Sequence, residues 1–199
     1  MKYNFTLFQL KIIMFVIGIS GCRCVGKDTF FNILYRLNTR FKRYAFADAL
    51  KYDLHPLIHT QFKIDLFNVG PYEKEIIRPI MISYGTAWRI IDKNHWVKKV
   101  DTQIQNEHVY DKNLVPVITD VRYDNELDFL REKYGEKFLH IHINRINSPE
   151  PTVEEMTSIS TIQHLADVNI TWGNNTDQEM INIVKQVYEK YNHYMFKNE

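Results

Sequence analysis

The sequence predicts an α/β fold, in which helices cover both faces of a five-stranded parallel sheet. Two observations predict it. Five short apolar runs of strand type alternate with segments of helical periodicity, an alternation typical of doubly wound parallel sheets. The first run also leads directly into a glycine-rich loop that opens a helical segment. We expect one domain over residues 1–199, because a chain of this length can bury a sizeable core.

The expected strands are the five apolar runs. The first is apolar throughout, which is typical of a central strand that is buried on both faces. Residues 1–11 precede it as an extension, and Met14 is an alternative start because the strand needs only the residues that follow. The second run is short, and the third ends at an aspartate. In chain order the runs are residues 12–19, 43–47, 114–119, 138–143 and 168–172.

Helical patterns fill the gaps between these runs, and two of them carry clear end signals. Gly135 follows one helix as a C-cap. Thr176 and Glu179 form a capping box before the last helix, whose apolar residues recur at helical spacing. We expect helices over residues 30–35, 48–57, 76–91, 95–105, 125–134 and from 177 onward.

Two insertions interrupt the alternation. Residues 62–78 are polar and rich in turn-forming residues, and residues 145–163 contain a further capping-box signal at Thr152 and Glu155. Both follow parts of the sheet where open α/β folds bind ligands. We therefore expect both to be closing segments that exclude water from a bound ligand, with the second acting as a lid.

The loop after the first strand carries the clearest motif, G-x-x-x-x-G-K between a strand and an amphipathic helix, which is the context of a phosphate-binding P-loop. Its glycines let backbone N–H groups approach an anion, and the following helix presents the positive end of its dipole. Lys27 can reach the terminal phosphates. We expect a nucleoside triphosphate to bind at Gly21, Cys22, Arg23, Cys24, Val25, Gly26, Lys27, Asp28 and Thr29.

Three residues are candidate ligands for Mg²⁺. Asp28 stands where the common motif has a Ser or Thr whose hydroxyl binds the metal, and Thr29 follows it. Asp120 ends the third apolar run, where a carboxylate can hold Mg²⁺ through water or bind a substrate group. The alternative for Asp120 is a helix cap.

Further polar residues lie where a ligand is expected. Arg122 follows the third strand at the carboxyl end of the sheet, and its guanidinium suits a phosphate or a base edge. Asp48 opens a helix and could be only its N-cap, while Lys51 on the next turn could contact a phosphate. Gly85 lies inside a helix, so a nucleobase or a neighbouring helix must approach closely there. Trp96, taken by itself, fits a core position best.

The composition excludes several classes of partner. The formal net charge of +1 creates no overall field toward nucleic acid or anionic lipid, so we expect neither as a partner. Residues 8–19 are interrupted by Gln9 and Lys11 and are too short for a membrane span. The two cysteines, Cys22 and Cys24, lie in the glycine-rich loop away from other metal-binding residues, which favours reduced thiols in the cytoplasm.

In their order along the chain, these motifs resemble one known family. The motifs are Gly26-Lys27-Asp28-Thr29, Phe46-Ala47-Asp48-Ala49-Leu50-Lys51, Gly85-Thr86 with Arg89 and Trp96, and Asp120-Val121-Arg122-Tyr123-Asp124-Asn125-Glu126. Over nearly its whole length the chain is similar to the deoxynucleoside monophosphate kinases of bacteriophages and large DNA viruses. The resemblance implies the three-layer fold of P-loop NTPases of the nucleoside monophosphate kinase type. It also implies ATP as donor, Mg²⁺ as cofactor, and γ-phosphoryl transfer to the 5′-phosphate of a deoxynucleotide in the cytoplasm of a host cell.

The resemblance also implies roles for single residues. Residues from about 48 to 110 would bind the acceptor, and Arg145 would mark the lid at about 145–163. Lys27, Asp120, Arg122 and Arg145 would serve catalysis. The acceptor would contact Asp48, Lys51, Arg78, Gly85, Arg89, Trp96, Arg122 and Asn125. Where the family's lid has a histidine followed by Ser-Glu, this chain has Glu154, Glu155 and Ser158.

Two other functions stay open at the level of the sequence. One is a small-molecule kinase similar to phosphomevalonate kinase, because the G-K-D-T element also occurs there. The other is a nucleotide-binding protein without turnover, against which the paired arginines argue. In each case the partners are small-molecule nucleotides or phosphates, and a homodimer is one assembly that the sequence permits.

Overall fold

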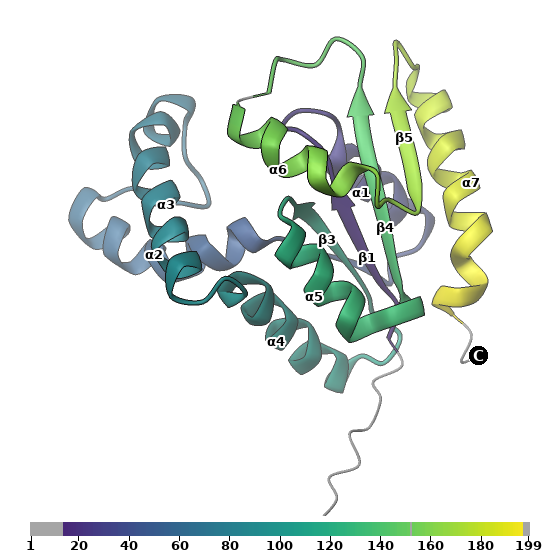
Figure 1. Cartoon of the computed structure of the whole chain (residues 1–199), viewed down its shortest axis with the longest axis horizontal. Coiled ribbons are helices and arrows are strands. Elements are labelled where there is room, and N and C mark those ends of the chain that lie inside the picture. The colour runs from purple at the N-terminus through teal and green to yellow at the C-terminus, as the bar shows by residue number, and fades with distance from the viewer. Residues whose placement is uncertain (1–13, 152, 197–199) are drawn as a thin grey trace, which may run out of the picture.

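The computed structural model describes residues 14–151 and 153–196, and its architecture confirms the expected α/β fold (Figure 1). Five parallel strands form one sheet in the order β2-β3-β1-β4-β5. The strands are β1 (Val16–Ser20), β2 (Phe41–Tyr44), β3 (Val115–Val121), β4 (Phe138–Arg145) and β5 (Val168–Trp172). Parallel pairing brings all five carboxyl ends to one edge of the sheet, where ligands bind in such folds.

Seven helices and a 3-10 turn follow the strands within the described residues. They are α1 (Lys27–Leu37), α2 (Phe46–Phe62), α3 (Pro71–Ile91), α4 (His95–Tyr110), α5 (Asp124–Tyr134), α6 (Val153–Gln163), α7 (Asp177–Met195) and the turn η1 (Gly135–Lys137). Buried side chains of α1 and α7 pack on one face of the sheet, and those of α2, α4 and α5 pack on the other. Figure 1 shows α2 and α3 extending beyond the sheet on the side away from α7.

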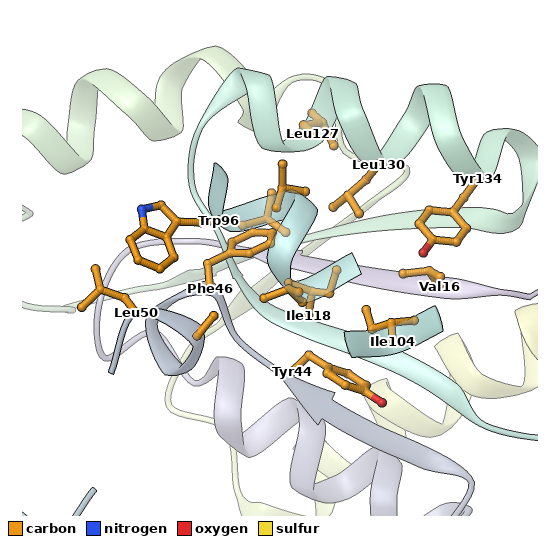
Figure 2. Close-up of a cluster of buried hydrophobic side chains, with 14 of the residues drawn as sticks. Val16, Tyr44, Phe46, Leu50, Trp96, Ile104, Ile118, Leu127, Leu130 and Tyr134 are labelled. Atoms are coloured by element: carbon orange, nitrogen blue, oxygen red, sulfur yellow. The ribbon is translucent and has the colours of Figure 1, made fainter. Parts of the chain in front are cut away.

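One of the two core clusters lies between the sheet and helices α2, α4 and α5. Figure 2 shows Val16 and Ile118 of the sheet facing Ile104 of α4 and Leu130 of α5. Each of these four side chains is at most 1% exposed. Burying an aliphatic side chain of this size contributes roughly 1.5–3 kcal/mol, so this cluster anchors α2, α4 and α5 to the sheet.

Several boundaries differ from the prediction. The second strand ends at Tyr44 rather than at residue 47, and the helix after it begins at Phe46 rather than at residue 48. The reason is a distant carboxylate: Asp120 accepts hydrogen bonds from the N–H groups of Phe46 and Ala47. The first strand is Val16–Ser20, and the part of the expected strand before residue 14 lies outside the described residues, as does the extension 1–11.

The first expected insertion is largely helical. Helix α3 begins at Pro71, so only the stretch between α2 and α3 remains a loop, whereas residues 62–78 were expected to be turns. Pro71 occupies the first turn, where its missing N–H costs nothing. The capping box at Thr176 is confirmed, because Thr176 Oγ1 accepts from the N–H of Glu179 at 3.3 Å. The corresponding signal at Thr152 lies outside the described residues.

Gly135 is confirmed as the residue that ends α5, with a positive φ of 54°. Glycine adopts such a backbone conformation without steric cost. In the part of the chain that the structure describes, no helix combines the length and the apolar composition needed to cross a membrane.

Candidate functional site

The glycine-rich loop lies at the carboxyl end of β1 and is held tightly against the sheet. Gly21 and Gly26 have φ values of 136° and 98°. A Cβ atom on Gly21 would overlap the carbonyl oxygen of Ile143 in β4, and one on Gly26 would lie 2.9 Å from Nε1 of Trp172 in β5. The loop therefore needs glycine at both positions, as a loop that wraps an anion requires.

Helix α1 begins directly at the end of this loop. No side chain caps its N-terminus, where Gly26 is the N-cap residue. The backbone N–H groups of the first turn thus have no side-chain acceptor, and the helix dipole adds positive potential at the same point. This arrangement is suited to binding a phosphate group.

Gly21→Ala is expected to lower the free energy of unfolding by about 2 kcal/mol, because the new methyl group clashes with β4 and strains a backbone of positive φ. The same substitution is expected to weaken ATP binding. Urea unfolding and an ATP titration measure the two effects. Gly135→Ala is the matched control, because Gly135 also has a positive φ but nothing lies within 4 Å of an added Cβ. Equal destabilisation of the two variants would contradict the close contact between the loop at Gly21 and strand β4.

The side chain of Lys27 folds back over the loop. Its Nζ donates to the carbonyl oxygens of Gly21 at 2.8 Å and Cys22 at 2.6 Å. Burial lowers the pKa of Lys27, and the neighbouring charge of Arg122 lowers it further. The charges of Asp120 and Asp28 act in the opposite direction and raise it. The lysine therefore has weak internal partners that an incoming phosphate can replace.

Arg122 lies beside the loop and contacts helix α6. Its Nη1 is 3.4 Å from Oε1 of Glu155, and Nε of Arg23 is 4.0 Å from Oε2 of the same carboxylate. The backbone of Arg122 is fixed as well, because its N–H donates to Oε2 of the buried Glu126 at 2.8 Å. Burial, with a contribution from the Asp120 charge, raises the pKa of Glu126 to about 7. Arg23, Lys27 and Arg122 thus bring three cationic side chains to one loop.

Asp120 acts as a cap in this structure. Its two carboxylate oxygens accept from the N–H groups of Phe46 at 2.8 Å and Ala47 at 2.9 Å. Burial raises the pKa of Asp120. The carboxylate thereby joins the end of β3 to the first turn of α2.

Comparison with solved structures shows which known fold this chain shares. The chain is similar to a dephospho-CoA kinase from Campylobacter jejuni, with a TM-score of 0.50 and 16% identity over 88% of this chain and 98% of that chain. It is also similar to a sugar kinase from Janibacter sp., with a TM-score of 0.50 and 11% identity over 88% of this chain and 95% of that chain. The chain has the P-loop kinase fold. Neither a scan against protein-family models nor a search of curated proteins finds a match.

The P-loop kinase fold brings Asp28 and Asp48 together through a residue that the sequence did not indicate. Arg43, on the edge strand β2, donates from Nη1 to Asp48 at 2.6 Å and lies 3.4 Å from Asp28 through Nε. Lys51 is 3.4 Å from the other oxygen of Asp48. No local pattern marks Arg43, because a lone arginine on a short edge strand is ordinary. Asp28 and Asp48, two expected site residues, are therefore linked by Arg43, which belongs to none of the sequence motifs.

Two predicted substrate contacts lie in the core instead. Trp96 is 2% exposed, and its Nε1 donates to the carbonyl oxygen of Gly85 at 3.1 Å. A Cβ on Gly85 would lie 2.7 Å from Cδ1 of Leu50. The close approach that Gly85 allows is thus made by helix α2, and the placement of Trp96 and Gly85 in an acceptor pocket needs correction.

The other predicted acceptor residues lie on α3 and α5. Arg89 stacks on the ring of Tyr123, with its guanidinium carbon 4.5 Å from the ring centroid. Asn125 donates to the carbonyl oxygen of Lys93 at 2.8 Å, which ties α5 to the turn between α3 and α4. Arg78 is 3.0 Å from Glu75 on the same helix. Arg89 and Asn125 therefore lie at the junction of α3 with the sheet, whereas Arg78 lies further along α3.

A pocket of about 410 Å³ lies at the exits of β4 and β5, on the opposite side of the loop from α2 and α3. Cys24 and the exposed Arg145 line it, together with Ile146, Asn147, Ser148, Pro149, Gly173, Asn174 and Asn175. The two exits of β4 and β5 form its walls. This pocket adjoins the phosphate loop and can hold the part of a nucleotide that extends away from its phosphates.

Below the loop, three buried side chains form a hydrogen-bonded chain. Ser20 Oγ lies 2.7 Å from His140 Nε2 and 2.8 Å from His142 Nδ1, and His142 Nε2 lies 3.1 Å from Asn144 Oδ1. Ser20, His140 and His142 are each 0% exposed. Since Asn144 Oδ1 accepts from His142 Nε2, His142 Nδ1 accepts from Ser20, and Ser20 accepts from His140. The chain therefore requires the imidazole of His142 to be neutral, and burial lowers the pKa of both His140 and His142.

Proposed function

We propose that this protein is an ATP-dependent kinase that phosphorylates deoxynucleoside monophosphates to diphosphates for dNTP synthesis. The observation that carries the proposal is the meeting of Arg23, Lys27 and Arg122 at an uncapped helix N-terminus. Phosphoryl transfer needs little covalent help from a protein, but it needs two polyanions held in line and their charge neutralised. Three cations around a phosphate loop supply that neutralisation.

The donor nucleotide is assigned to the loop and the pocket beside it. The β- and γ-phosphates would lie on the N–H groups of the loop, where Lys27 exchanges its carbonyl partners for phosphate oxygens. The base and ribose would extend into the pocket lined by Cys24 and Arg145. Arg145 is exposed there, so its guanidinium is accessible to a ligand.

Mg²⁺ fits the carboxylates at this site. The ion binds through one or two carboxylates, several waters and phosphate oxygens, and it neutralises charge on the transferred group. Asp28 lies on the first turn of α1, and Asp120 lies near the carboxyl end of β3, at the edge of the sheet where the loop is. Thr29 adds a hydroxyl on the first turn of α1. These three residues would hold the ion, mainly through its waters.

The acceptor is assigned to the side of the loop formed by α2 and α3. Asp48, Lys51 and Arg89 line this side, and Arg122 lies between it and the loop. The attacking group is a phosphate oxygen that is already ionised at neutral pH, so no side chain has to remove a proton from it. The protein's task is to hold two phosphate groups together against their repulsion.

A smaller phosphorylated acceptor is the second candidate, as in a kinase similar to phosphomevalonate kinase. The burial of Trp96 and Gly85 leaves this alternative open, because two residues expected near a nucleobase face the core instead.

Release of ADP from ATP and Mg²⁺ tests the proposal, with deoxynucleoside monophosphates, ribonucleoside monophosphates and phosphomevalonate as acceptors. We expect turnover with one or more deoxynucleotides and a new diphosphate in the ³¹P NMR spectrum. Turnover with phosphomevalonate alone would favour the second candidate. ATP binding without turnover on any acceptor would favour a nucleotide-binding protein.

Arg43→Gln is expected to raise KM for the acceptor about fivefold with a smaller change in kcat. Without Arg43, the carboxylate of Asp48 loses its strongest ion pair, and its charge repels the acceptor phosphate. Initial rates over a range of acceptor concentrations separate the two constants. Lys42→Gln is the matched control, because Lys42 is the neighbouring residue of β2 and pairs with Glu107 instead. Equal effects from both variants would show that Arg43 acts only through the general charge of the strand.

A further inference from the structure

The carboxylate of Glu155 occupies a place where a phosphate would be expected. Its side chain is 12% exposed although it comes from α6, outside the sheet. Arg122 approaches one of its oxygens at 3.4 Å, and Arg23 approaches the other at 4.0 Å. Both arginines belong to the group of cations that surrounds the phosphate loop.

The pKa of the Cys22 thiol, which lies in the loop, depends on the same charged groups. Burial raises the pKa of Cys22, the charge of Glu155 raises it further, and Lys27 and Arg122 lower it. Cys22 therefore lies within the field of all three charged groups. Arg23 is itself a residue of the loop, so its contact with Glu155 places this carboxylate at the loop.

We propose that Glu155 serves as an internal stand-in for phosphate, pairing with Arg23 and Arg122 until a nucleotide phosphate displaces it. The proposal rests on the proposed binding of a nucleotide at the loop. A carboxylate and a phosphate compete for the same guanidinium N–H groups, and phosphate offers more charge and more acceptor oxygens. Lys27 shows the same resting state, because its ammonium group binds two carbonyl oxygens of its own loop.

Displacement links ligand binding to the position of α6. The first turn of α6 contacts the loop through Glu155, whereas Ile159 and Ile162, further along α6, are buried against the rest of the protein. When phosphate takes over the arginines, the first turn loses this ion pair while the rest of the helix keeps its apolar contacts. Glu155 thus sets how tightly the site binds phosphate and makes the first turn of α6 respond to it.

The test is the affinity of the full chain for MgATP and for inorganic tripolyphosphate, measured by calorimetry. Glu155→Gln removes the competing charge and keeps the shape, so we expect both affinities to rise about threefold to tenfold. Glu189→Gln is the matched control, because Glu189 is an exposed partner of Lys185 on α7, and it should change neither affinity. Unchanged or weaker binding by Glu155→Gln would overturn the proposal, since a residue that merely orients Arg122 would weaken binding when neutralised.

A second readout does not involve nucleotides. In a Cys24→Ser background, Cys22 is the only remaining thiol, and Glu155→Gln should increase its rate of alkylation at a fixed pH near 8 because a nearby negative charge is lost. An unchanged rate would place Glu155 away from the loop and overturn the proposal.

These outcomes separate this proposal from the kinase proposal. If the wild-type protein binds tripolyphosphate but transfers no phosphoryl group, the kinase proposal fails and the Glu155 measurement still decides the present one. If the wild-type protein binds neither ATP nor tripolyphosphate, both proposals are wrong.

Discussion

Lys27→Ala is expected to reduce acceptor-dependent ADP release by about 10²–10³-fold or more, while the protein stays folded. In the proposed transfer reaction the ammonium group would neutralise charge on the phosphoryl group that moves, because it already lies against the carbonyl oxygens of the loop. Arg23 and Arg122 remain in the variant, where both contact Glu155.

The stability of Lys27→Ala should differ from that of the wild type by less than about 1 kcal/mol. The variant loses two hydrogen bonds to Gly21 and Cys22, and this is offset because a partly buried ammonium group, whose pKa is lowered by burial, is no longer desolvated. Thermal unfolding and ADP release together make the test. Lys185→Ala, on the exposed face of α7, is the matched control and should keep full activity. A Lys27→Ala protein with more than a tenth of wild-type turnover would show that the phosphate site lies elsewhere.

The sequence predicts those parts of the fold that depend on short, contiguous patterns of residues. Apolar runs located all five strands, and alternation with helices predicted their parallel pairing. The start of α2 was misplaced because Asp120, more than seventy residues away, supplies the acceptors for its first N–H groups. A capping residue that lies on another strand produces no pattern in the sequence around the helix that it caps. Thr176 lies directly before the helix that it caps, and its role was predicted correctly.

The same distinction applies to the site. The loop from Gly21 to Gly26 is a contiguous motif, and the structure gives it the positive φ values that such a motif needs. Glu155 and Arg43 reach the site from α6 and β2, so only the folded chain shows that they meet Arg122 and Asp48. Trp96 shows the opposite error: the resemblance placed it at the acceptor, although its pattern in the sequence already favoured the core.

His140 is a residue of β4 that should make the protein sensitive to acid. Burial lowers the pKa of His140 from 6.5 to about 4. As the pH falls below 6.5, His140 is protonated in the unfolded chain but stays neutral in the folded protein. The free energy of unfolding therefore decreases between pH 6.5 and 4. A shift of this size corresponds to a loss on the order of 3 kcal/mol. Glu126 acts in the opposite direction, because its raised pKa of about 7 favours the folded state as the pH falls from 7.

A comparison of variants isolates the histidine from this opposing effect. His140→Gln keeps a donor for Ser20 but cannot titrate, so its stability should fall less than that of the wild type between pH 6.5 and 4. His164→Gln, on the exposed face of α6, should follow the wild-type profile. Urea unfolding at several pH values gives the three curves, and parallel curves for His140→Gln and the wild type would contradict a neutral buried imidazole.

Ser20→Ala tests the hydrogen-bonded chain itself, and at pH 7 it should cost about 3 kcal/mol of unfolding free energy. The substitution leaves ring nitrogens of two fully buried imidazoles, His140 and His142, without their shared partner, and each unsatisfied polar group costs about 1–3 kcal/mol. Ser158→Ala is the matched control, because Ser158 donates to a backbone carbonyl in the partly exposed helix α6 and shares no buried partner. Because Ser20 ends β1 where the phosphate loop begins, the loss should also weaken ATP binding. A stable Ser20→Ala protein with normal ATP affinity would show that the loop is positioned by its glycines alone.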